Sequence, residues 1–587
     1  MKKIRLKYPL LVCAAGLLFG ALPLWRGVPV WGDTLFHAMW YTNFSAQLLA
    51  GDVYPRWLIN LNGGLGSPVF FYYAPLPYYI TTLFAFLMPG GLYGTLHLGA
   101  SAALAIIASG LTAYGWLKES AGARAAAAAS VLYMLMPYHL AVDVYTRDAF
   151  AEVWAFVWMP LILYFVRRSS GNSDRSKFFP PGLALAYAAL VTTHPPSTLI
   201  FSPIPLCYAF FTTEPQRRLR ATLRTAGGML LGAGLSSLYL LPAMLNQEFI
   251  SLGDLLPGDY HQRWLRLTNF NLLLIEGRVT VAFLLTAGVV ICAFIMSRGD
   301  GGTTATTEGN AGKRERLFWL SVVATCVLLM TAPGDFVWRI IKPLQIIQFP
   351  WRFNTVFCVA AAAIIANGVR AIPRTTPVGA LRLAALVGAC VLVLGWVVFT
   401  VHVARKEFPS LRRGSPAGTD AAYLKRLEQG RDAPEYRPAD AASTQAGHFE
   451  QLLSRICRED GRLAKACVVE GAGTFTFERW QPREIRLRVE TGGGVVFNVS
   501  QFYYPGWTAY VDGRRAHPLA PSQPDGLLHL ALPPGTHGLT LRLEKTPPES
   551  IGQLVSAASL VVLLLWLAVG VPSPKTQVPG LKSDSLS

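Results

Sequence analysis

The sequence predicts an all-α polytopic membrane protein with about twelve transmembrane helices, joined to a mostly-β, sandwich-like domain near the C-terminus. Three observations predict this fold class. Hydrophobic residues make up 52% of the 587 residues and charged residues only 15%, which is too apolar for a soluble protein of this size. Apolar runs approaching the length of about 20 residues that spans a bilayer recur along the chain. After residue 402 the pattern changes to charged segments and then to alternating strands.

The apolar runs predict the individual helices. We expect spans at 8–25, 94–117, 125–140, 149–166, 180–193, 197–212, 225–245, 279–297, 317–332, 353–371, 378–401 and 551–571. The run 72–90 contains Pro75, Pro77 and many aromatic residues, so we interpret it as a re-entrant or interfacial helix. The basic start at 1–7 is also typical of a signal peptide. No small-x-small cleavage site follows it, which favours a retained first helix.

The distribution of basic residues predicts the orientation. The net charge is +18, and Lys and Arg cluster in the short segments between spans, as the positive-inside rule describes. With the N-terminus in the cytoplasm and 72–90 not spanning, all of these clusters fall on one face. We therefore expect both termini in the cytoplasm. The sequence contains no long basic stripe and no nucleic-acid module, so we expect no nucleic-acid partner.

This orientation divides the chain into three parts. Residues 1–402 form the transmembrane helical domain, whose first extracytoplasmic loop is 26–73. Residues 403–550 form an extracytoplasmic domain that is β-rich from 471, and residues 551–587 hold the last helix and the cytoplasmic tail. The alternating pattern and the turn signals after 471 are typical of a small β-sandwich, which would serve as a structural cap or a partner surface.

The cysteines separate into two groups. Six of the eight lie within or beside apolar runs, where cysteine behaves as a small hydrophobic residue. Cys457 and Cys467 lie instead in a polar stretch of the C-terminal domain. Outside the cytoplasm these two are candidates for a disulfide, and inside it they would be free thiols.

Ionisable residues gather at the non-cytoplasmic ends of the expected spans, where such groups rarely occur without a use. Asp33 follows the first span directly, and His37 lies four residues later. The two side chains share a face if 34–50 is helical. Asp33 is then either the N-cap of that helix or a functional carboxylate, and the two roles do not exclude each other.

A second group of ionisable residues lies at 143–152. Asp143 and Arg147 are four residues apart and suit an ion pair. Asp148 and Glu152 place like charges at the same spacing, which is unfavourable on a helix. We expect Glu152 one turn inside the membrane edge, where an acid needs a partner. The group is therefore either part of a functional site or a structural ion-pair network.

Two single residues at the same face are further candidates. His194 lies in a turn flanked by prolines, where a lone histidine is more often structural than catalytic. Arg352 opens a span from the outside, and its planar guanidinium suits either the membrane surface or a phosphate.

Several familiar motifs are missing. The Gly-rich segment 62–68 lacks the Gly-Lys-Ser/Thr ending of a P-loop, so it is either a place for backbone to approach a ligand or a flexible turn. The sequence has no Cys/His array with zinc spacing and no Gly-x-Ser-x-Gly elbow. Its acids are scattered, although an acidic metal site stays open.

The order of these motifs resembles a bacterial membrane family labelled "6-pyruvoyl-tetrahydropterin synthase-related". The segments that carry the resemblance are Asp33, the aromatic and Pro-rich run 70–79, the turn 145–152, the segment 348–353, and 504–507 followed by Asp512-Gly513. The resemblance covers nearly the whole chain. Despite the label, nothing in the sequence is similar to the soluble zinc-dependent pterin enzyme.

The layout also resembles the GT-C glycosyltransferases, which are multi-span enzymes with an acidic residue in the first external loop. This resemblance implies an inverting enzyme of the bacterial plasma (inner) membrane. Such an enzyme would transfer a hexose or pentose from a polyprenyl-phosphate donor, held among membrane lipid, to an extracytoplasmic glycan, lipid or protein. Asp33 would be the general base. The expected substrate-binding residues are His37, Arg147, Asp148, Glu152, His194 and Arg352. Some members carry an adjacent acidic pair at the position where this sequence has the single acid Asp33, which leaves the use of a divalent cation open.

Two other classes of function compete with this interpretation. The first is a non-catalytic membrane component of polysaccharide assembly or export, with the β-rich domain as its docking surface. The second is a transporter, for which internal repeats and broken midplane helices are typical. The sequence shows no clear repeat, and its polar residues lie at one face, which favours an enzyme that works at that membrane edge.

Overall fold

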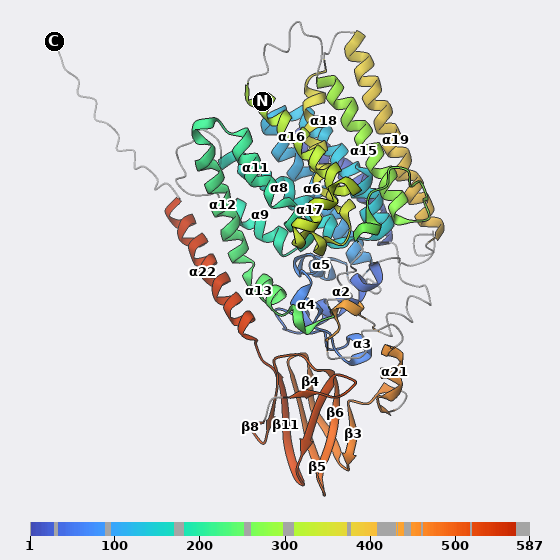
Figure 1. Cartoon of the computed structure of the whole chain (residues 1–587), viewed down its shortest axis with the longest axis vertical. Coiled ribbons are helices and arrows are strands. Elements are labelled where there is room, and N and C mark those ends of the chain that lie inside the picture. Colours follow the sequence, from blue (N-terminus) through green and yellow to red (C-terminus); the bar gives the residue numbers. More distant parts are fainter. Residues whose placement is uncertain are drawn as a thin grey trace, which may run out of the picture.

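The long apolar segments form a bundle of helices, and the alternating segments near the C-terminus form a β-region beyond one end of it (Figure 1). The computed structural model describes residues 2–28, 33–88, 95–169, 181–251, 260–297, 310–372, 377–407, 430, 432–439, 448–459, 462–516 and 519–570. The fold class is therefore the expected one, a helical membrane protein with a mostly-β C-terminal region.

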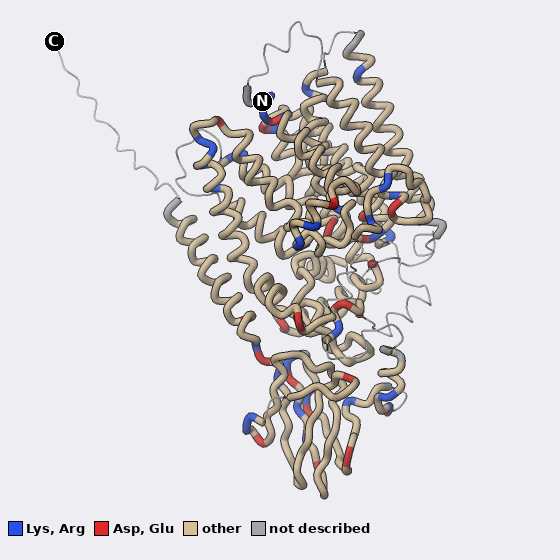
Figure 2. Tube along the Cα trace, viewed as in Figure 1, with Lys and Arg blue, Asp and Glu red and all other residues tan. Residues whose placement is uncertain are grey.

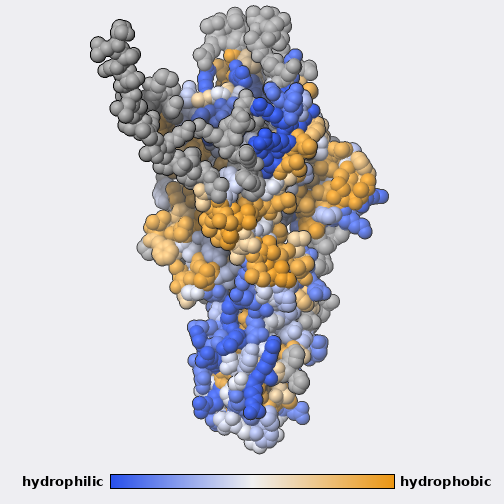
Figure 3. All heavy atoms as spheres, turned by 90° about the vertical axis from the view of Figure 1, so that its left-hand side faces the viewer, coloured by the Kyte–Doolittle hydropathy of each residue, from blue (hydrophilic) through white to orange (hydrophobic). Residues whose placement is uncertain are grey.

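Eight helices in the described ranges are long and apolar enough to cross a membrane. They are α1 (Lys2–Arg26), α6 (Thr95–Ala121), α7 (Ala123–Leu135) with its continuation, α8 (Phe150–Ser169), α15 (Ile275–Ser297), α18 (Asn354–Arg370), α19 (Pro377–Glu407) and α22 (Pro547–Gly570). On the face shown in Figure 3, hydrophobic side chains form a band between the hydrophilic β-region and a hydrophilic patch towards the opposite end.

Two further helix pairs are sharply bent. The pairs are α12 (Arg218–Leu235) with α13 (Ser237–Leu245), at 75°, and α16 (Asn310–Met330) with α17 (Asp335–Ile340), at 92°. If each pair counts as one span, the described part of the chain has ten spans, compared with the twelve expected.

The two remaining expected spans, 180–193 and 197–212, form short helices instead. They are α9 (Pro181–Val191), α10 (Pro195–Phe201) and α11 (Pro203–Thr212). Pro195 opens a new helix after the His194 turn, because proline lacks the N–H that would continue the previous one. Ser202 between α10 and α11 keeps helical dihedrals, with φ −54° and ψ −35°, so these two follow one another directly. The run 72–90 forms α5 (Leu76–Leu87), whose 12 residues are too short to cross a bilayer core of about 30 Å at 1.5 Å per residue.

Basic residues lie at several helix ends remote from the β-region, and others lie in the middle of the view and on the β-region itself (Figure 2). Lys118 is in the last turn of α6, and Arg167 and Arg168 end α8. Arg167 pairs with Glu315 at the start of α16, with 2.8 Å between Nη1 and Oε1. This arrangement is the one on which the predicted orientation rests.

The first loop folds between the spans and the β-region (Figure 1). It contains α2 (Thr34–Leu49), α3 (Leu61–Gly64) and α4 (Val69–Tyr72). Its aromatic side chains pack on α5, since the ring centroid of Phe70 lies 4.7 Å from that of Phe44 and 4.8 Å from that of Tyr78. All three rings are fully buried, which holds the loop firmly on the helical part.

The span that begins with α7 changes its winding before it ends. Beyond Pro137 it continues as a π-helix, η2 (Tyr138–Arg147). Wide π-turns are rare and often mark functional sites. The remaining short helices are η3 (Pro215–Arg217), η4 (Gln247–Phe249), η5 (Tyr260–Arg263), η6 (Ala332–Gly334), η7 (Lys342–Ile347), η8 (Pro350–Phe353), η10 (Pro434–Tyr436) and α21 (His448–Arg455).

The β-region consists of two antiparallel sheets and a two-stranded ribbon. The ribbon pairs β1 (Arg458–Glu459) with β2 (Arg462–Leu463). The first sheet has the order β3 (Ala466–Gly471), β6 (Val495–Phe502), β10 (Leu527–Leu532), β9 (Ala520–Pro521). The second has the order β4 (Thr474–Gln481), β5 (Glu484–Thr491), β11 (Gly535–Leu543), β7 (Trp507–Val511), β8 (Arg514–Arg515).

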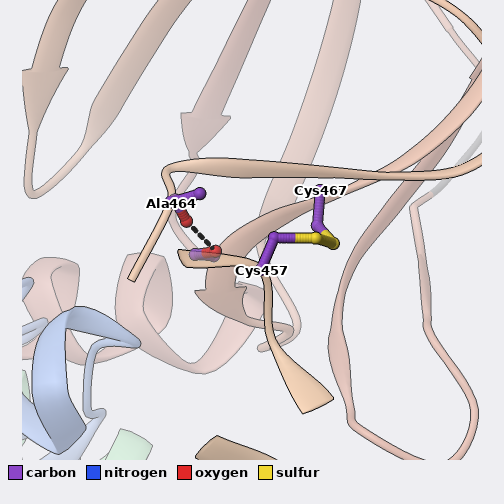
Figure 4. The surroundings of a disulfide bond; sticks show 4 residues. Cys457, Ala464 and Cys467 are labelled. Atoms are coloured by element: carbon purple, nitrogen blue, oxygen red, sulfur yellow. Dashed lines mark hydrogen bonds between the residues drawn. A yellow bond between two sulfur atoms is a disulfide. The ribbon is translucent and has the colours of Figure 1, made fainter. Parts of the chain in front are cut away.

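The two sheets pack face to face as a sandwich. Inward residues alternate along β5, where Ile485, Leu487 and Val489 are buried. Phe475 of one sheet contacts Phe497 of the other, with ring centroids 4.8 Å apart. At the edge of the sandwich a disulfide joins Cys457 to Cys467, and the Ala464 N–H donates to the Cys457 carbonyl nearby (Figure 4).

The β-region docks on the Gly-rich part of the first loop. The Trp57 indole donates to Oε1 of Gln501 at 2.9 Å, and the Phe502 N–H donates to the Leu65 carbonyl. Gly66 has a φ of 82°, and a Cβ there would lie 2.5 Å from the Trp57 ring. Close backbone packing against Trp57 and Gln501 therefore requires this glycine, and the segment serves domain docking.

A buried ion pair ties the last helix to the same loop. Nη1 of Arg56 lies 2.8 Å from Oε1 of Glu549, and the two side chains are 2% and 1% exposed. Arg56 also donates to the Leu238 carbonyl and stacks on the Tyr54 ring at 4.3 Å. Three distant segments of the chain are joined at this point.

Candidate active site

The helix ends that face the β-region bring the sequence-predicted polar residues together. They come from five separate elements: the start of α2, the end of η2, the start of α8, the turn between α9 and α10, and η8. Direct contacts or electrostatic interactions connect Asp33, His37, Arg147, Asp148, Glu152, His194 and Arg352 into one cluster.

Asp33 presents an uncommitted carboxylate at the edge of this cluster. It occupies the N-cap position of α2, yet its side chain makes no capping hydrogen bond. The backbone of Asp33 forms the hydrogen bonds at this helix start. Its N–H donates to the Arg147 carbonyl, and its carbonyl accepts from the His37 N–H. The residue is exposed, so the carboxylate is available to a substrate.

His37 is buried one turn further along α2. Its Nδ1 lies 2.7 Å from the Tyr78 hydroxyl. Burial lowers the pKa of His37 to about 4, although the negative charge of Asp33 opposes that shift. The imidazole is therefore neutral near pH 7 and orients its neighbours through hydrogen bonds.

Arg147 is held between two buried carboxylates. Its Nη1 lies 3.1 Å from Oδ1 of Asp143 and 3.0 Å from Oε2 of Glu152. Tyr138 donates to the other oxygen of Glu152 at 2.9 Å, and the guanidinium lies 4.7 Å from the centre of the Trp351 ring. The predicted alternative of an ion-pair network thus describes Arg147 and Asp143 well, and the two acids neutralise its charge.

Asp148 sits in a left-handed backbone conformation, with φ 52° and ψ 51°. A non-glycine residue there is strained, and such strain gathers at functional sites. Burial raises the pKa of Asp148 to about 8; a hydrogen bond with Thr34 opposes the shift and the charge of Asp33 adds to it. Asp148 is therefore mostly protonated at pH 7, so a neutral carboxyl stands beside Asp33.

Arg352 differs from Arg147 in having donors to spare. Its Nη1 donates to the Ile347 carbonyl at 2.8 Å, and its Nε lies 3.8 Å from Glu152. That Nε forms no hydrogen bond with the described residues. The side chain is 13% exposed, compared with 6% for Arg147. Its guanidinium can accept an anion without first giving up a carboxylate.

His194 acts mainly as a helix cap. Its ring accepts from the Ser197 N–H at the start of α10 and lies 2.7 Å from the Ser197 hydroxyl. Burial lowers the pKa of His194 to about 3, with the nearby charge of Glu152 opposing the shift. The geometry favours the structural interpretation of this residue.

The described residues contain no group of three or more His, Cys, Asp or Glu side chains that could hold a metal ion. Two residues of the cluster, Tyr138 and Trp351, were not predicted from the sequence. Tyr138 and Trp351 surround the Arg147 guanidinium, and only their proximity to charged residues along the chain hinted at this role.

The chain was compared with known families, curated proteins and solved structures. A family model described as "6-pyruvoyl-tetrahydropterin synthase related domain; membrane protein" matches residues 70–406, more than half of the 587 residues. The chain belongs to this family. The matched segment includes Arg147, Glu152 and Arg352, whereas Asp33 precedes it. The search of curated proteins gives no match.

Solved structures with a related arrangement include two of the arabinofuranosyltransferase AftD from Mycobacteria. The first is 14% identical with a TM-score of 0.41, and covers 69% of this chain and 27% of that one. The second, of the R1389S mutant, is 12% identical with a TM-score of 0.44, and covers 70% of this chain and 28% of that one. The chain thus spans little more than a quarter of the AftD length.

Proposed function

We propose that this membrane protein is an inverting glycosyltransferase that moves a sugar from a polyprenyl-phosphate donor to an extracytoplasmic acceptor. One observation carries the proposal. An exposed carboxylate that makes no capping hydrogen bond with the described residues, Asp33, lies within electrostatic range of a guanidinium with spare donors, Arg352, at one end of the membrane helices.

The first part of the reaction is proton removal from the acceptor. Asp33 takes the proton of an acceptor hydroxyl as that oxygen attacks the anomeric carbon of the donor sugar. The new bond joins the acceptor oxygen to the anomeric carbon, and the bond from that carbon to the phosphate oxygen breaks. Direct displacement inverts the anomeric centre, and the exposed Asp33 can release its proton to water.

The second part is stabilisation of the leaving group. Polyprenyl phosphate departs with the electron pair and gains negative charge, which needs cationic or hydrogen-bond donors. Arg352 can supply them, because its Nε forms no hydrogen bond with the described residues. Arg147 is already neutralised by Asp143 and Glu152, so it supports the site by holding Trp351 and Glu152 in place.

The location of the cluster suits a lipid-linked donor. The site lies at the ends of membrane helices next to the first loop, and the protein carries an apolar band that suits a bilayer (Figure 3). A polyprenyl chain would lie among membrane lipid and present its phosphate at this edge. We place the cluster and the β-region outside the cytoplasm of a bacterial plasma membrane, with both termini inside, because the basic helix ends lie at the opposite face.

The proposal is tested by comparing lipid extracts from a deletion strain that carries the wild-type gene, no gene, or the Asp33→Asn variant. Loss of transfer should make a polyprenyl-phosphate sugar accumulate in the deletion strain and in the Asp33→Asn strain, as measured by mass spectrometry. Asp512→Asn is the matched control, because Asp512 is an exposed aspartate on the β-region and asparagine tolerates its positive φ. A wild-type lipid profile from Asp33→Asn, with normal protein levels, would reject the assignment.

A further inference from the structure

Three aromatic side chains meet beside Asp33, and none of them belongs to the charged cluster. The ring centroid of Trp40 lies 4.7 Å from that of Tyr73 and 5.6 Å from that of Tyr436. The two tyrosine rings are 6.0 Å apart and nearly perpendicular, at 83°. Trp40 comes from α2, Tyr73 follows α4, and Tyr436 ends η10, so three separate segments build this group.

The third segment, residues 432–439, lies across the first loop, and we refer to it as the strap. Asp432, which is 1% exposed, anchors it. One of its carboxylate oxygens accepts from the Trp40 indole at 2.7 Å, and the other accepts from the Ser67 hydroxyl. The backbone N–H of Asp432 donates to the Asn62 side chain at 3.0 Å. Trp40 is thus fixed by the same carboxylate that positions Tyr436.

The far end of the strap is also held. Pro438 forms a β-bridge with Ile250, and the Ala439 N–H donates to the Phe249 carbonyl at 3.0 Å. The strap therefore has anchors on both sides of Tyr436. A ring held in this way loses little conformational freedom when a ligand stacks on it.

The rings and hydroxyls of Tyr73 and Tyr436 are available to a ligand. Both are only partly buried, and neither hydroxyl forms a hydrogen bond with any residue in the described part of the chain. Tyr73 lies within electrostatic range of Asp33 and Arg352, so the aromatic group adjoins the charged cluster. Trp40 differs from them, because it is 3% exposed and its indole N–H is paired with Asp432, so it supports the two tyrosines from behind.

We propose that Tyr73 and Tyr436, packed on the buried Trp40, form a subsite for a sugar ring of the acceptor, which makes the acceptor a glycan. This inference rests on the proposed function, because the bound sugar is an acceptor only if the protein is a glycosyltransferase. A pyranose or furanose ring has an apolar C–H face that aromatic rings bind by excluding water, and its hydroxyls can hydrogen-bond to the free phenol groups. A sugar stacked there would lie beside Asp33, which needs an acceptor hydroxyl within reach.

Glycan binding is measured directly, without turnover, on a glycan array with the purified full-length protein in detergent. The wild-type protein should bind at least one array glycan, and Tyr436→Ala should weaken that binding by roughly tenfold, since about 1.4 kcal/mol corresponds to a factor of ten. Tyr436→Phe keeps the ring and should bind within about threefold of wild type. Tyr510→Ala removes a partly buried tyrosine of the β-region and should change nothing.

Two results would overturn the subsite: a wild-type protein that binds no array glycan, or Tyr436→Ala that folds normally and binds as tightly as wild type. Asp33→Asn separates the two proposals, because it should bind glycan normally while failing to consume donor. If Asp33→Asn consumes donor and Tyr436→Ala has lost glycan binding, the catalytic role of Asp33 is rejected and the subsite stands.

Discussion

Arg147 and Arg352 lie in one cluster, but we expect Arg147 to stabilise the fold and Arg352 to bind the donor. Substituting each residue separates these two roles. In Arg147→Gln the carboxylates of Asp143 and Glu152, which are 0% and 1% exposed, lose their counterion. Breaking a buried pair in this way costs about 3–5 kcal/mol, a large share of the roughly 5–15 kcal/mol that stabilises a typical domain. Arg147→Gln should therefore fold poorly or melt far below wild type.

Arg352→Gln should show the opposite behaviour. The contact of Arg352 with Glu152 is long at 3.8 Å, and Glu152 keeps Arg147 as its counterion, so the loss to folding should be smaller than in Arg147→Gln. The loss to donor binding should be larger, because a charge-assisted hydrogen bond contributes about 1.5–3 kcal/mol. The apparent KM for a polyprenyl-phosphate donor should then rise roughly ten- to hundredfold.

Thermal unfolding in detergent, followed by tryptophan fluorescence, measures the first effect, and donor titration measures the second. Arg263→Gln is a suitable control for a lost ion pair, since Arg263 pairs with Glu276 but is 50% exposed. A partial rescue of Arg147→Gln by a second change, Asp143→Asn, should follow from removing one stranded carboxylate. The reasoning fails if Arg147→Gln melts like wild type, or if Arg352→Gln is equally unstable.

Three other predictions concern a buried acid, a buried ion pair and the disulfide. The pKa of Asp148 is about 8 in the folded protein and about 3.9 in unfolded chains, so between these pH values the native state holds one extra proton. The free energy of unfolding should therefore fall by up to about 1.4 kcal/mol per pH unit as pH rises towards 8. Asp148→Asn should flatten this slope in melting curves recorded from pH 5 to 9. Arg56→Met should leave the buried Glu549 carboxylate without a counterion and lower the free energy of unfolding by about 3–5 kcal/mol. The double variant Arg56→Met with Glu549→Met should lose much less stability. Equal melting temperatures for the two variants would contradict this. In intact cells, Cys457 and Cys467 should react with maleimide only after reduction, and labelling without reduction would argue against an oxidising location for the β-region.

The sequence was a good guide to features that depend on local pattern. Apolar length located the eight long spans, and the four-residue spacing of Asp143 and Arg147 gave their ion pair. Period-two alternation located strands such as β5 and β6. These signals are local because helix and strand periodicity decide which side chains share a face.

Features that depend on distant contacts could not be anticipated. Asp432 lies in a mixed charged stretch without periodicity, and its partners Trp40 and Ser67 are 392 and 365 residues away. The Gly-rich segment 62–68 suggested a ligand or a flexible turn, whereas Gly66 lets Trp57 and Gln501 pack on the backbone. Only the folded chain shows what each of these residues meets.

The expected count of twelve spans was high for a related reason. Apolar composition identified 180–193 and 197–212 as candidate spans, but composition alone does not predict where a proline interrupts a helix. Pro195 begins a new helix after the His194 turn, which divides this apolar stretch into α9 and the consecutive α10 and α11.

The central claim is that Asp33 removes the acceptor proton during sugar transfer from a lipid phosphate. The most direct measurement uses the lipid-linked sugar that accumulates in the deletion strain as the donor for purified wild-type and Asp33→Asn proteins in liposomes, with release of polyprenyl phosphate followed by mass spectrometry. Loss of a general base typically slows a reaction by about 10²–10⁴-fold, so Asp33→Asn should release polyprenyl phosphate at about 1% of the wild-type rate or less. Equal rates from two equally stable proteins would contradict the account.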